Sequence, residues 1–248
     1  MTHKGEKKHL KRTSALKYWS TPKKETKFTV KPSPGPHPAL QCIPLLIIVR
    51  NLLHFADTAR EAKRIISSGE IKIDGVVRKS LKYPVGLMDV LEIPKINKFY
   101  RIIAAPRRGL ILHPIEEDEA QFKLCRIENK LVVNGGHIQL NLHDSRNILI
   151  KLKNPTAAVE DVYKTKDVLK LSIPSQDILE HIKFDENIHS MVIAGRHLGL
   201  YGKITKIEKR FGPHASTVSL EKNGKHFQTA LEYAFPLGIE QSLISLPE

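Results

Sequence analysis

The densest group of side chains that could exchange protons is the acidic run at residues 116–119, Glu-Glu-Asp-Glu. Paired carboxylates can act as general acid and base when they face each other in a pocket. Adjacent carboxylates in a loop usually point into solvent instead. His143-Asp144 followed by Ser145 has the residue types of a hydrolase triad, but no strand–turn–helix elbow surrounds the serine. Neither group predicts catalysis.

Residues that can bind metals are present, but without the spacing of metal ligands. The chain contains 12 histidines and two cysteines, Cys42 and Cys125. Neither cysteine has a Cys-x-x-Cys partner, and no His-x-x-x-His pair lies on a predicted helix. The Asn-Gly-Gly turn at residues 134–136 is not followed by a helix with Lys-Ser or Lys-Thr, so it predicts no nucleotide loop. We expect no catalytic residue, no metal and no cofactor.

The composition favours binding to a polyanion. Forty Lys and Arg residues against 26 Asp and Glu residues give a net charge of +14 over 248 residues. Such a charge repels itself, so a polyanionic partner such as nucleic acid is the first candidate. Two cysteines predict a reducing compartment rather than a disulfide scaffold. No apolar run is long enough for a membrane span, and the basic N-terminus lacks the apolar core of a signal peptide, so we expect a cytoplasmic protein without a membrane partner.

Much of the positive charge lies in the first 31 residues, which hold ten basic and two acidic side chains. The segment contains Tyr18, Trp19 and Phe28 but has no helical or strand period, so it cannot collapse by itself. We expect an extended arm that orders against phosphates while its aromatic rings stack or wedge. A solvated tail or a localisation signal is the alternative. The residues of this tail that we expect to contact RNA are Lys4, Lys7, Lys8, Lys11, Arg12 and Trp19.

A connector with four prolines at residues 31–38 separates the tail from the first folded unit, which is predicted to begin near Leu40. An apolar helix is expected over residues 45–55. A second helix follows, which Thr58 caps and Glu61 completes as a capping box.

Gly69 is expected to end the second helix, and Asp74-Gly75 predicts a hairpin turn between two short strands. The order of elements from Ala56 to Ile93 resembles the alpha-L RNA-binding motif, whose second helix and hairpin grip folded RNA. An ordinary solvated helix face is the alternative explanation of the charge. The candidate RNA contacts of this unit are Arg60, Lys63, Arg64, Lys72, Arg78 and Lys79.

A second unit is predicted from short apolar runs separated by turns, which is typical of a small antiparallel sheet or barrel. The expected strands lie near residues 110–112, 122–124, 131–133, 138–140 and 148–150. The expected turns lie at residues 128–130, 134–136 and 143–147. Arg107 and Arg108 precede the first strand and are candidate RNA contacts. Gly109 next to them allows either a close approach to a phosphate or a tight turn.

A third unit contains the strand at residues 190–194, a loop with three glycines, and a returning strand at residues 203–207. Glycines in such a loop permit phosphate contact or relieve hairpin strain. The whole string resembles the KOW motif of SH3-like RNA-binding barrels, with Gly202 at the motif's central glycine. The candidate RNA contacts here are Arg196, Gly202, Lys203 and Lys206.

Several strings in order make the chain resemble the archaeal and eukaryotic ("e" type) small-subunit ribosomal protein four family. They include Lys-His-Leu-Lys-Arg at 8–12, Pro-Ser-Pro-Gly-Pro-His at 32–37, Pro-Arg-Arg-Gly-Leu at 106–110 and Gln-Leu-Asn-Leu-His-Asp at 139–144. The resemblance implies a structural ribosomal protein, not an enzyme, that binds small-subunit rRNA beside neighbouring small-subunit proteins. It implies a monomer within the ribosome and no small-molecule substrate.

The expected fold class is α+β, multi-domain and mainly β. The expected parts are an extended tail (1–40), an alpha-L domain (41–97), a central β domain (98–173) and a KOW barrel with a C-terminal extension (174–248). Because alpha-L modules also occur on pseudouridine synthases and a tRNA synthetase, the alternative is a non-ribosomal RNA chaperone or RNA-modification factor.

Overall fold

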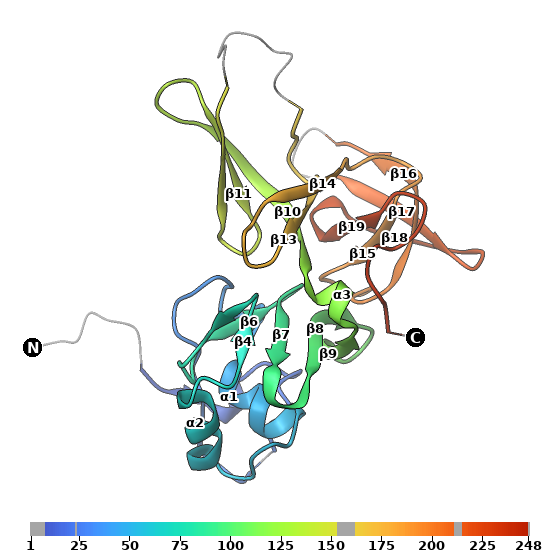
Figure 1. The fold of residues 1–248 in the computed structure, drawn as a ribbon. Coiled ribbons are helices and arrows are strands. Elements are labelled where there is room, and N and C mark those ends of the chain that lie inside the picture. The colour runs from blue at the N-terminus through green and yellow to red at the C-terminus, as the bar shows by residue number, and fades with distance from the viewer. Residues whose placement is uncertain (1–7, 23, 153–161, 211–214, 248) are drawn as a thin grey trace, which may run out of the picture.

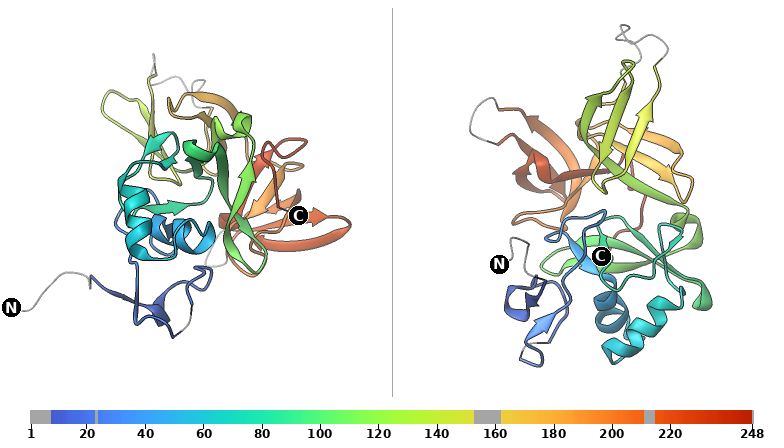
Figure 2. Two further views of the ribbon diagram at one scale, coloured as in Figure 1. Left: turned by 60° about the horizontal axis from the view of Figure 1, so that its bottom comes forward. Right: turned by 90° about the vertical axis from the view of Figure 1, so that its left-hand side faces the viewer.

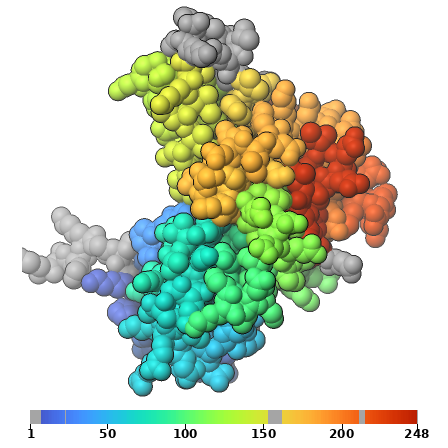
Figure 3. All heavy atoms as spheres, in the orientation of Figure 1, coloured from blue at the N-terminus to red at the C-terminus, as the bar shows by residue number. Residues whose placement is uncertain are grey.

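The computed structural model describes residues 8–22, 24–152, 162–210 and 215–247. Within these ranges the chain is mostly β-structure with short helices, and three five-stranded antiparallel sheets form most of it. One sheet and the longer helices make an N-terminal lobe, and the other two sheets lie side by side across from it (Figures 1 and 2). The space-filling view shows the three parts in contact (Figure 3). No helix in the described ranges is long and apolar enough to cross a membrane.

The apolar run after the connector forms the predicted first helix of the N-terminal lobe. Helix α1 (Leu45–Ile47) continues directly into the π-helical segment η2 (Ile48–Leu52). Every apolar side chain from Ile43 to Val49 is nearly or fully buried, so this segment is the centre of the lobe's core. Burial of such side chains contributes roughly 1.5–3 kcal/mol each.

Helix α2 (Ala59–Ser67) begins as its sequence predicts. The backbone N–H of Glu61 donates to Thr58 Oγ1, and the backbone N–H of Thr58 donates to the Glu61 carboxylate, which completes the capping box. Gly69 follows the helix with a φ of +81°, a conformation that favours glycine. Ala62 and Ile66 are buried against the first helix, which leaves the charged face of α2 in solvent.

The sheet of the N-terminal lobe has the strand order β5-β4-β7-β8-β9. The Asp74-Gly75 turn joins β4 to β5 with a positive φ at both residues, as the predicted hairpin requires. A separate strand pair, β3 with β6, closes the lobe next to the first helix. The bounds of these elements are β3 Cys42–Pro44, β4 Lys72–Ile73, β5 Val76–Val77, β6 Pro84–Gly86, β7 Val90–Ile93, η3 Pro94–Ile96, β8 Lys98–Ala105 and β9 Gly109–Ile115.

The strand pairing changes the expected division of the chain between residues 97 and 98. Strand β8 pairs with β7 along its first half and with β9 along its length, so β8 and β9 belong to the sheet of the N-terminal lobe. Asn97, with a φ of +48°, lies in the connection between β7 and β8, so the expected boundary falls inside one sheet.

The described part of the basic tail is folded against the N-terminal lobe. Strands β1 (Leu10–Lys11) and β2 (Phe28–Thr29) pair, and the 3-10 turn η1 (Arg12–Ser14) follows β1. Trp19 is only 2% exposed, packs into the lobe's core, and donates its indole N–H to the carbonyl of Cys42 at 2.9 Å. Trp19, which we expected to contact RNA, instead fills a core position, so its ring does not lie on the surface of the tail.

The central sheet has the strand order β12-β11-β10-β13-β14. The turn expected at residues 128–130 is wrong, because β10 runs through it with a shift of register between Ile127 and Asn129 that marks a β-bulge. The turns at 134–136 and 143–147 are confirmed. The bounds are α3 Glu117–Ala120, β10 Phe122–Val132, β11 Ile138–Leu142, β12 Asn147–Ile150, β13 Val168–Ser172 and β14 Ile178–Ile182.

The C-terminal sheet has the strand order β18-β17-β16-β15-β19 and contains the predicted strands of the third unit. Arg126 of β10 ties this sheet to the central one, since its guanidinium donates to the carbonyls of Glu232 and Ala234 at 2.8 Å. The bounds are β15 His189–Val192, β16 Tyr201–Glu208, β17 Thr217–Lys222, β18 Lys225–Ala230, η5 Leu231–Tyr233 and β19 Ala234–Gly238.

Candidate nucleic-acid interface

The exposed face of α2 carries the first group of predicted contacts. Arg60, Lys63 and Arg64 are exposed on the side opposite the buried Ala62 and Ile66. Arg60 and Arg64 also line a surface hollow of about 520 Å³ at the start of the helix. Residues four apart on a helix point the same way, so the two guanidinium groups can face one phosphate-bearing ligand.

The hairpin that follows α2 contributes less free charge than its sequence suggests. Lys72 forms an ion pair with Glu92 on the neighbouring strand at 2.9 Å. The guanidinium of Arg78 lies 4.8 Å from the ring centre of Tyr83, a cation–π contact within the lobe. Lys79 is exposed. Lys72 and Arg78 therefore already stabilise the fold, and Lys79 is the hairpin's solvent-facing cation among these three.

Cations from three separate segments of the chain lie around one hollow. Arg107 and Arg108 in the β8–β9 turn, Arg196 in the β15–β16 loop and Lys17 of the tail line a groove of about 650 Å³. Arg107, Arg108 and Arg196 are exposed. We name this hollow the basic groove. Four cations from three parts of the chain can approach one stretch of phosphate backbone.

The structure gives Gly109 a packing role that neither explanation from the sequence named. Gly109 has a φ of +79°, and a Cβ on it would lie 2.5 Å from Cβ of Tyr18. Gly199 makes a similar close approach, because a Cβ there would lie 2.4 Å from the backbone carbon of Ala105. These glycines let the tail and the β15–β16 loop pack onto the β8–β9 hairpin and so form the basic groove.

The C-terminal sheet presents two of its predicted contacts and hides a third. Lys203 and Lys206 are exposed on β16, and Lys206 pairs with Glu208 at 2.9 Å. Gly202 is buried, and a Cβ on it would lie 2.4 Å from the carbonyl oxygen of Glu221. Gly202, which we expected to contact RNA, instead packs against β17, because the missing side chain makes room for that strand.

The basic residues of the tail differ in whether their side chains are available to bind RNA. Lys8 and Lys11 are exposed. The guanidinium of Arg12 donates to the carbonyls of Thr21 and Pro22 and so holds the tail's own turn together. Lys4 and Lys7 lie outside the described residues.

A buried charged cluster joins the N-terminal lobe to the central sheet, and sequence reasoning missed it. The ammonium of Lys123 on β10 lies 2.9 Å from a carboxylate oxygen of Asp74 and 2.9 Å from one of Asp144, and it also binds Asp89. Lys123 is 1% exposed. We name this group, with Arg146 and His37, the charged junction. The signal available in the sequence was a lysine within an apolar strand.

Two further side chains complete the charged junction. Arg146 binds Asp74 at 2.6 Å and Asp144 at 3.1 Å. His37 of the proline connector lies 3.0 Å from Asp89, and its ring packs where a Cβ on Gly86 would be. The carboxylates also accept backbone N–H groups, from Gly86 to Asp89 and from Val90 to Asp74, at 2.9 Å. Three segments of the chain thus meet at one set of hydrogen-bonded charges.

The charges of the junction reinforce one another. Burial alone would lower the pKa of Lys123, but Asp74, Asp89 and Asp144 outweigh it and raise that pKa well above its usual value. Burial alone would raise the pKa of Asp144, but Lys123 and its other neighbours lower it to about 2. In the same way, His37 and Lys123 outweigh burial and hold the pKa of Asp89 well below its usual range. These groups are therefore ionised at neutral pH.

Cys125, His143 and Asp144 place their donor atoms within 4.8 Å of one another, a spacing that would suit a metal ion. Each group already has a partner. Nδ1 of His143 accepts the backbone N–H of Arg126 and Nε2 donates to the carbonyl of Leu87, both at 3.2 Å. Burial raises the pKa of the Cys125 thiol well above its usual value, so the thiolate that a metal prefers is disfavoured. The arrangement favours a neutral histidine in a hydrogen-bonded core.

The acidic run at residues 116–119 forms the start of the short helix α3 rather than a loop. Glu116, Glu117 and Asp118 are exposed, as expected of a solvated run. Glu119 instead accepts the Nε–H of the fully buried Arg101 at 3.1 Å. One carboxylate of the run therefore neutralises a buried guanidinium, and the others face solvent.

Three family models match successive parts of the chain. The RS4NT domain matches residues 4–40, the S4 domain matches residues 44–91, and the ribosomal family S4e matches residues 96–178. Small ribosomal subunit protein eS4 of Staphylothermus marinus is 53% identical over 100% of this chain and 99% of its own length. The chain belongs to the S4e family of ribosomal proteins.

Other S4e relatives agree with this assignment over the same length. The eS4 protein of Methanocaldococcus jannaschii is 49% identical over 99% of this chain and 100% of its own. The crystal structure of 30S ribosomal protein S4e from Thermoplasma acidophilum matches with a TM-score of 0.67 and 32% identity, covering 80% of this chain and 95% of that one. The predicted family is confirmed, and the S4 model coincides with the elements that carry Arg60, Lys63 and Arg64.

Proposed function

We propose that this protein is a structural constituent of the small ribosomal subunit that binds small-subunit rRNA. The observation that carries the proposal is the S4e relationship over the whole chain, at 53% identity to a protein named for its place in that subunit. The exposed cations supply the chemistry. The face of α2 and the basic groove offer guanidinium and ammonium groups to phosphates.

The proposed mechanism is shape-based docking by several modules. Double-stranded RNA is read mainly through its backbone and 2′-hydroxyls, so cations on rigid scaffolds suit it better than base-reading side chains. The charged junction fixes the N-terminal lobe, which carries the face of α2 together with Arg107 and Arg108, against the central sheet. The tail residues Lys4, Lys7, Lys8 and Lys11 extend this contact along the RNA.

The finer assignments belong to the same proposal. The C-terminal sheet is a KOW module of SH3-like type, whose exposed Lys203 and Lys206 face rRNA. The protein acts in the cytoplasm as one copy within the subunit, next to other small-subunit proteins. Its role is architectural rather than catalytic.

Filter binding of the purified chain to the source organism's small-subunit rRNA tests the function. We expect saturable binding that weakens steeply with salt, because each neutralised phosphate releases a counterion. An unrelated RNA of equal length is the control, and equal affinity for both would contradict specific ribosomal binding. Mass analysis of the rRNA after incubation separates the alternative, since a modified nucleotide would indicate an RNA-modification factor.

A further inference from the structure

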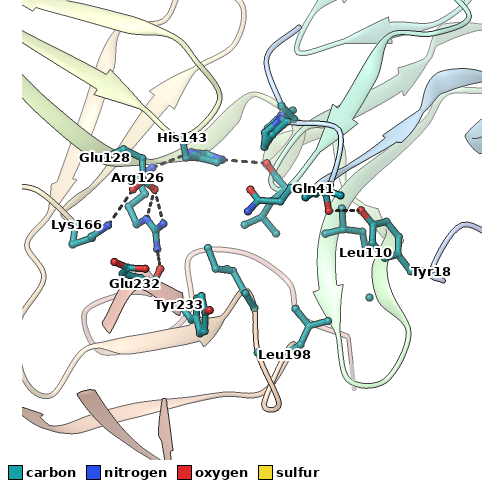
Figure 4. A pocket seen from close by; sticks show the side chains of 18 residues that line it. Tyr18, Gln41, Leu110, Arg126, Glu128, His143, Lys166, Leu198, Glu232 and Tyr233 are labelled. Carbon is teal, nitrogen blue, oxygen red and sulfur yellow. Dashed lines mark hydrogen bonds and ion pairs between the residues drawn. The ribbon is translucent and has the colours of Figure 1, made fainter. Parts of the chain in front are cut away.

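A second hollow adjoins the basic groove where the N-terminal lobe meets the other two sheets. It has a volume of about 660 Å³, and Figure 4 shows its lining. The two hollows share part of their walls, which is formed by Tyr18, Gly109, Leu110, Gly195 and Leu198. The two hollows are therefore immediate neighbours. We name the second hollow the inner cavity.

The inner cavity has the lining of a site for a flat ligand with polar edges. Leu40, Leu110 and Leu198 give it apolar walls, and the rings of Tyr18 and Tyr233 belong to its lining. Leu40 is 76% exposed and Tyr233 is 37% exposed, which leaves apolar surface uncovered at the entrance. Pockets of this size and character bind small or protruding groups.

Polar groups lie along the cavity's other walls. Gln41 supplies an exposed side-chain amide, which can both donate and accept hydrogen bonds. Glu128 is held by Arg126 and by Lys166, the latter at 3.1 Å (Figure 4). This wall is fixed by its own ion pairs and by the bonds of Arg126 to Glu232 and Ala234. These bonds hold the polar wall of the cavity in place before a ligand binds.

The two hollows differ in charge in a way that matches a nucleotide. Among the described residues that line the basic groove, Lys17, Arg107, Arg108 and Arg196 are charged and none is acidic. The anionic phosphates of a nucleotide therefore fit the basic groove. A base suits the inner cavity, because an unstacked base combines an aromatic face with hydrogen-bonding edges.

We propose that one unstacked nucleotide of the rRNA inserts its base into the inner cavity while its flanking phosphates lie in the basic groove. This proposal rests on the proposed function, since it names one contact within rRNA binding. An apolar side chain of a neighbouring protein could fill the cavity, but it would leave the four cations of the groove without an anionic partner. Single-stranded or bulged rRNA supplies both parts of the ligand.

Two substitutions test the cavity without touching the charge of the groove. Gln41→Trp fills the cavity from an exposed position, and Tyr233→Ala removes one of its rings. Since stacking of one base is worth several-fold to a hundred-fold in affinity, we expect each variant to bind rRNA about ten-fold more weakly with an unchanged salt slope. The matched controls are Gln121→Trp and Phe55→Ala, at exposed positions outside both hollows, and they should bind like the wild type.

Wild-type affinity for both cavity variants would overturn the inserted base while leaving the proposed function intact. Failure of the unaltered chain to bind rRNA would instead overturn the proposed function. Circular dichroism checks that each variant is folded. A second measurement uses the unaltered chain. Ultraviolet cross-linking of the chain bound to rRNA, followed by mass spectrometry, should give nucleotide adducts on Tyr18, Tyr233 or residues 193–198.

Adducts found on α2 and on tail residues other than Tyr18, but on no residue of the inner cavity, would overturn the proposal. Free AMP distinguishes a polymer from a small nucleotide as the occupant. We expect that a large excess of AMP leaves the rRNA complex intact, because AMP cannot also engage the α2 face. Displacement of rRNA by AMP, or cavity adducts with AMP but not with rRNA, would show that the site serves a free nucleotide and would refute the rRNA occupant.

Discussion

Replacement of Lys123 by methionine removes the central cation of the charged junction. Lys123 is buried and lies within 2.9 Å of carboxylate oxygens of Asp74 and Asp144, and it also binds Asp89. The substitution keeps most of the side chain's volume but leaves three buried carboxylates to share Arg146 and His37. Removing one partner of a buried ion pair costs about 3–5 kcal/mol.

For a chain of this size, that loss corresponds to a fall in Tm of roughly 6–20 °C. Differential scanning calorimetry of the purified protein measures the fall. Lys98→Met is the matched control, because Lys98 is exposed and the change in net charge is the same. We expect the control to alter Tm by a degree or two at most, since surface substitutions usually change stability little.

A second substitution tests whether charge is the cause. In the Lys123→Met background, Asp89→Asn removes one of the uncompensated carboxylates, so the double variant should be more stable than the single one. A Lys123→Met variant that melts within about 2 °C of the wild type, or a double variant no more stable than the single one, would refute the role assigned to the junction.

Three other predictions concern pH and RNA. Burial lowers the pKa of His143 from 6.5 to about 4, so the unfolded chain takes up its proton first and stability should fall as pH drops from 6.5 to 4. Because the pKa of Asp144 is lowered to about 2, the loss of stability should continue below pH 4. Urea titrations should show that the stability of His143→Gln depends less on pH between 6.5 and 4 than that of the wild type, and an equal pH dependence in that range would contradict this. Arg60→Glu with Arg64→Glu should weaken rRNA binding by several kcal/mol in filter binding with unchanged circular dichroism, because both side chains face solvent; wild-type affinity would exclude the α2 face. Arg196→Gln should lower the magnitude of the log–log salt slope by about one, and no change would remove Arg196 from the phosphate contacts.

Local features of the fold could be predicted because short-range chemistry fixes them. The capping box of Thr58 and Glu61 and the Asp74-Gly75 turn form as their residue types require. The charged face of α2 follows from helical periodicity alone. Several short residue strings in the right order then indicated the family, whereas composition alone indicated only a protein that binds a polyanion.

The features that could not be predicted depend on contacts between residues that are far apart in the sequence. Trp19 could not be assigned to the core because its partner, the carbonyl of Cys42, lies 23 positions away. The sheet that joins β7 to β8 and the bulge in β10 depend on which strands meet. Lys123 is a strand lysine by sequence, and only the fold brings the aspartates around it. The basic groove is likewise assembled from distant segments, although its arginines were individually predicted.

Sedimentation of the source cells' lysate through a sucrose gradient, with this protein quantified by mass spectrometry, tests the ribosomal assignment most directly. We expect it in the small-subunit peak at about one copy per subunit, retained when the subunits are washed in moderate salt because many phosphate contacts are lost only together. Recovery of the protein in the slowly sedimenting fractions, with small subunits that lack it, would contradict the assignment.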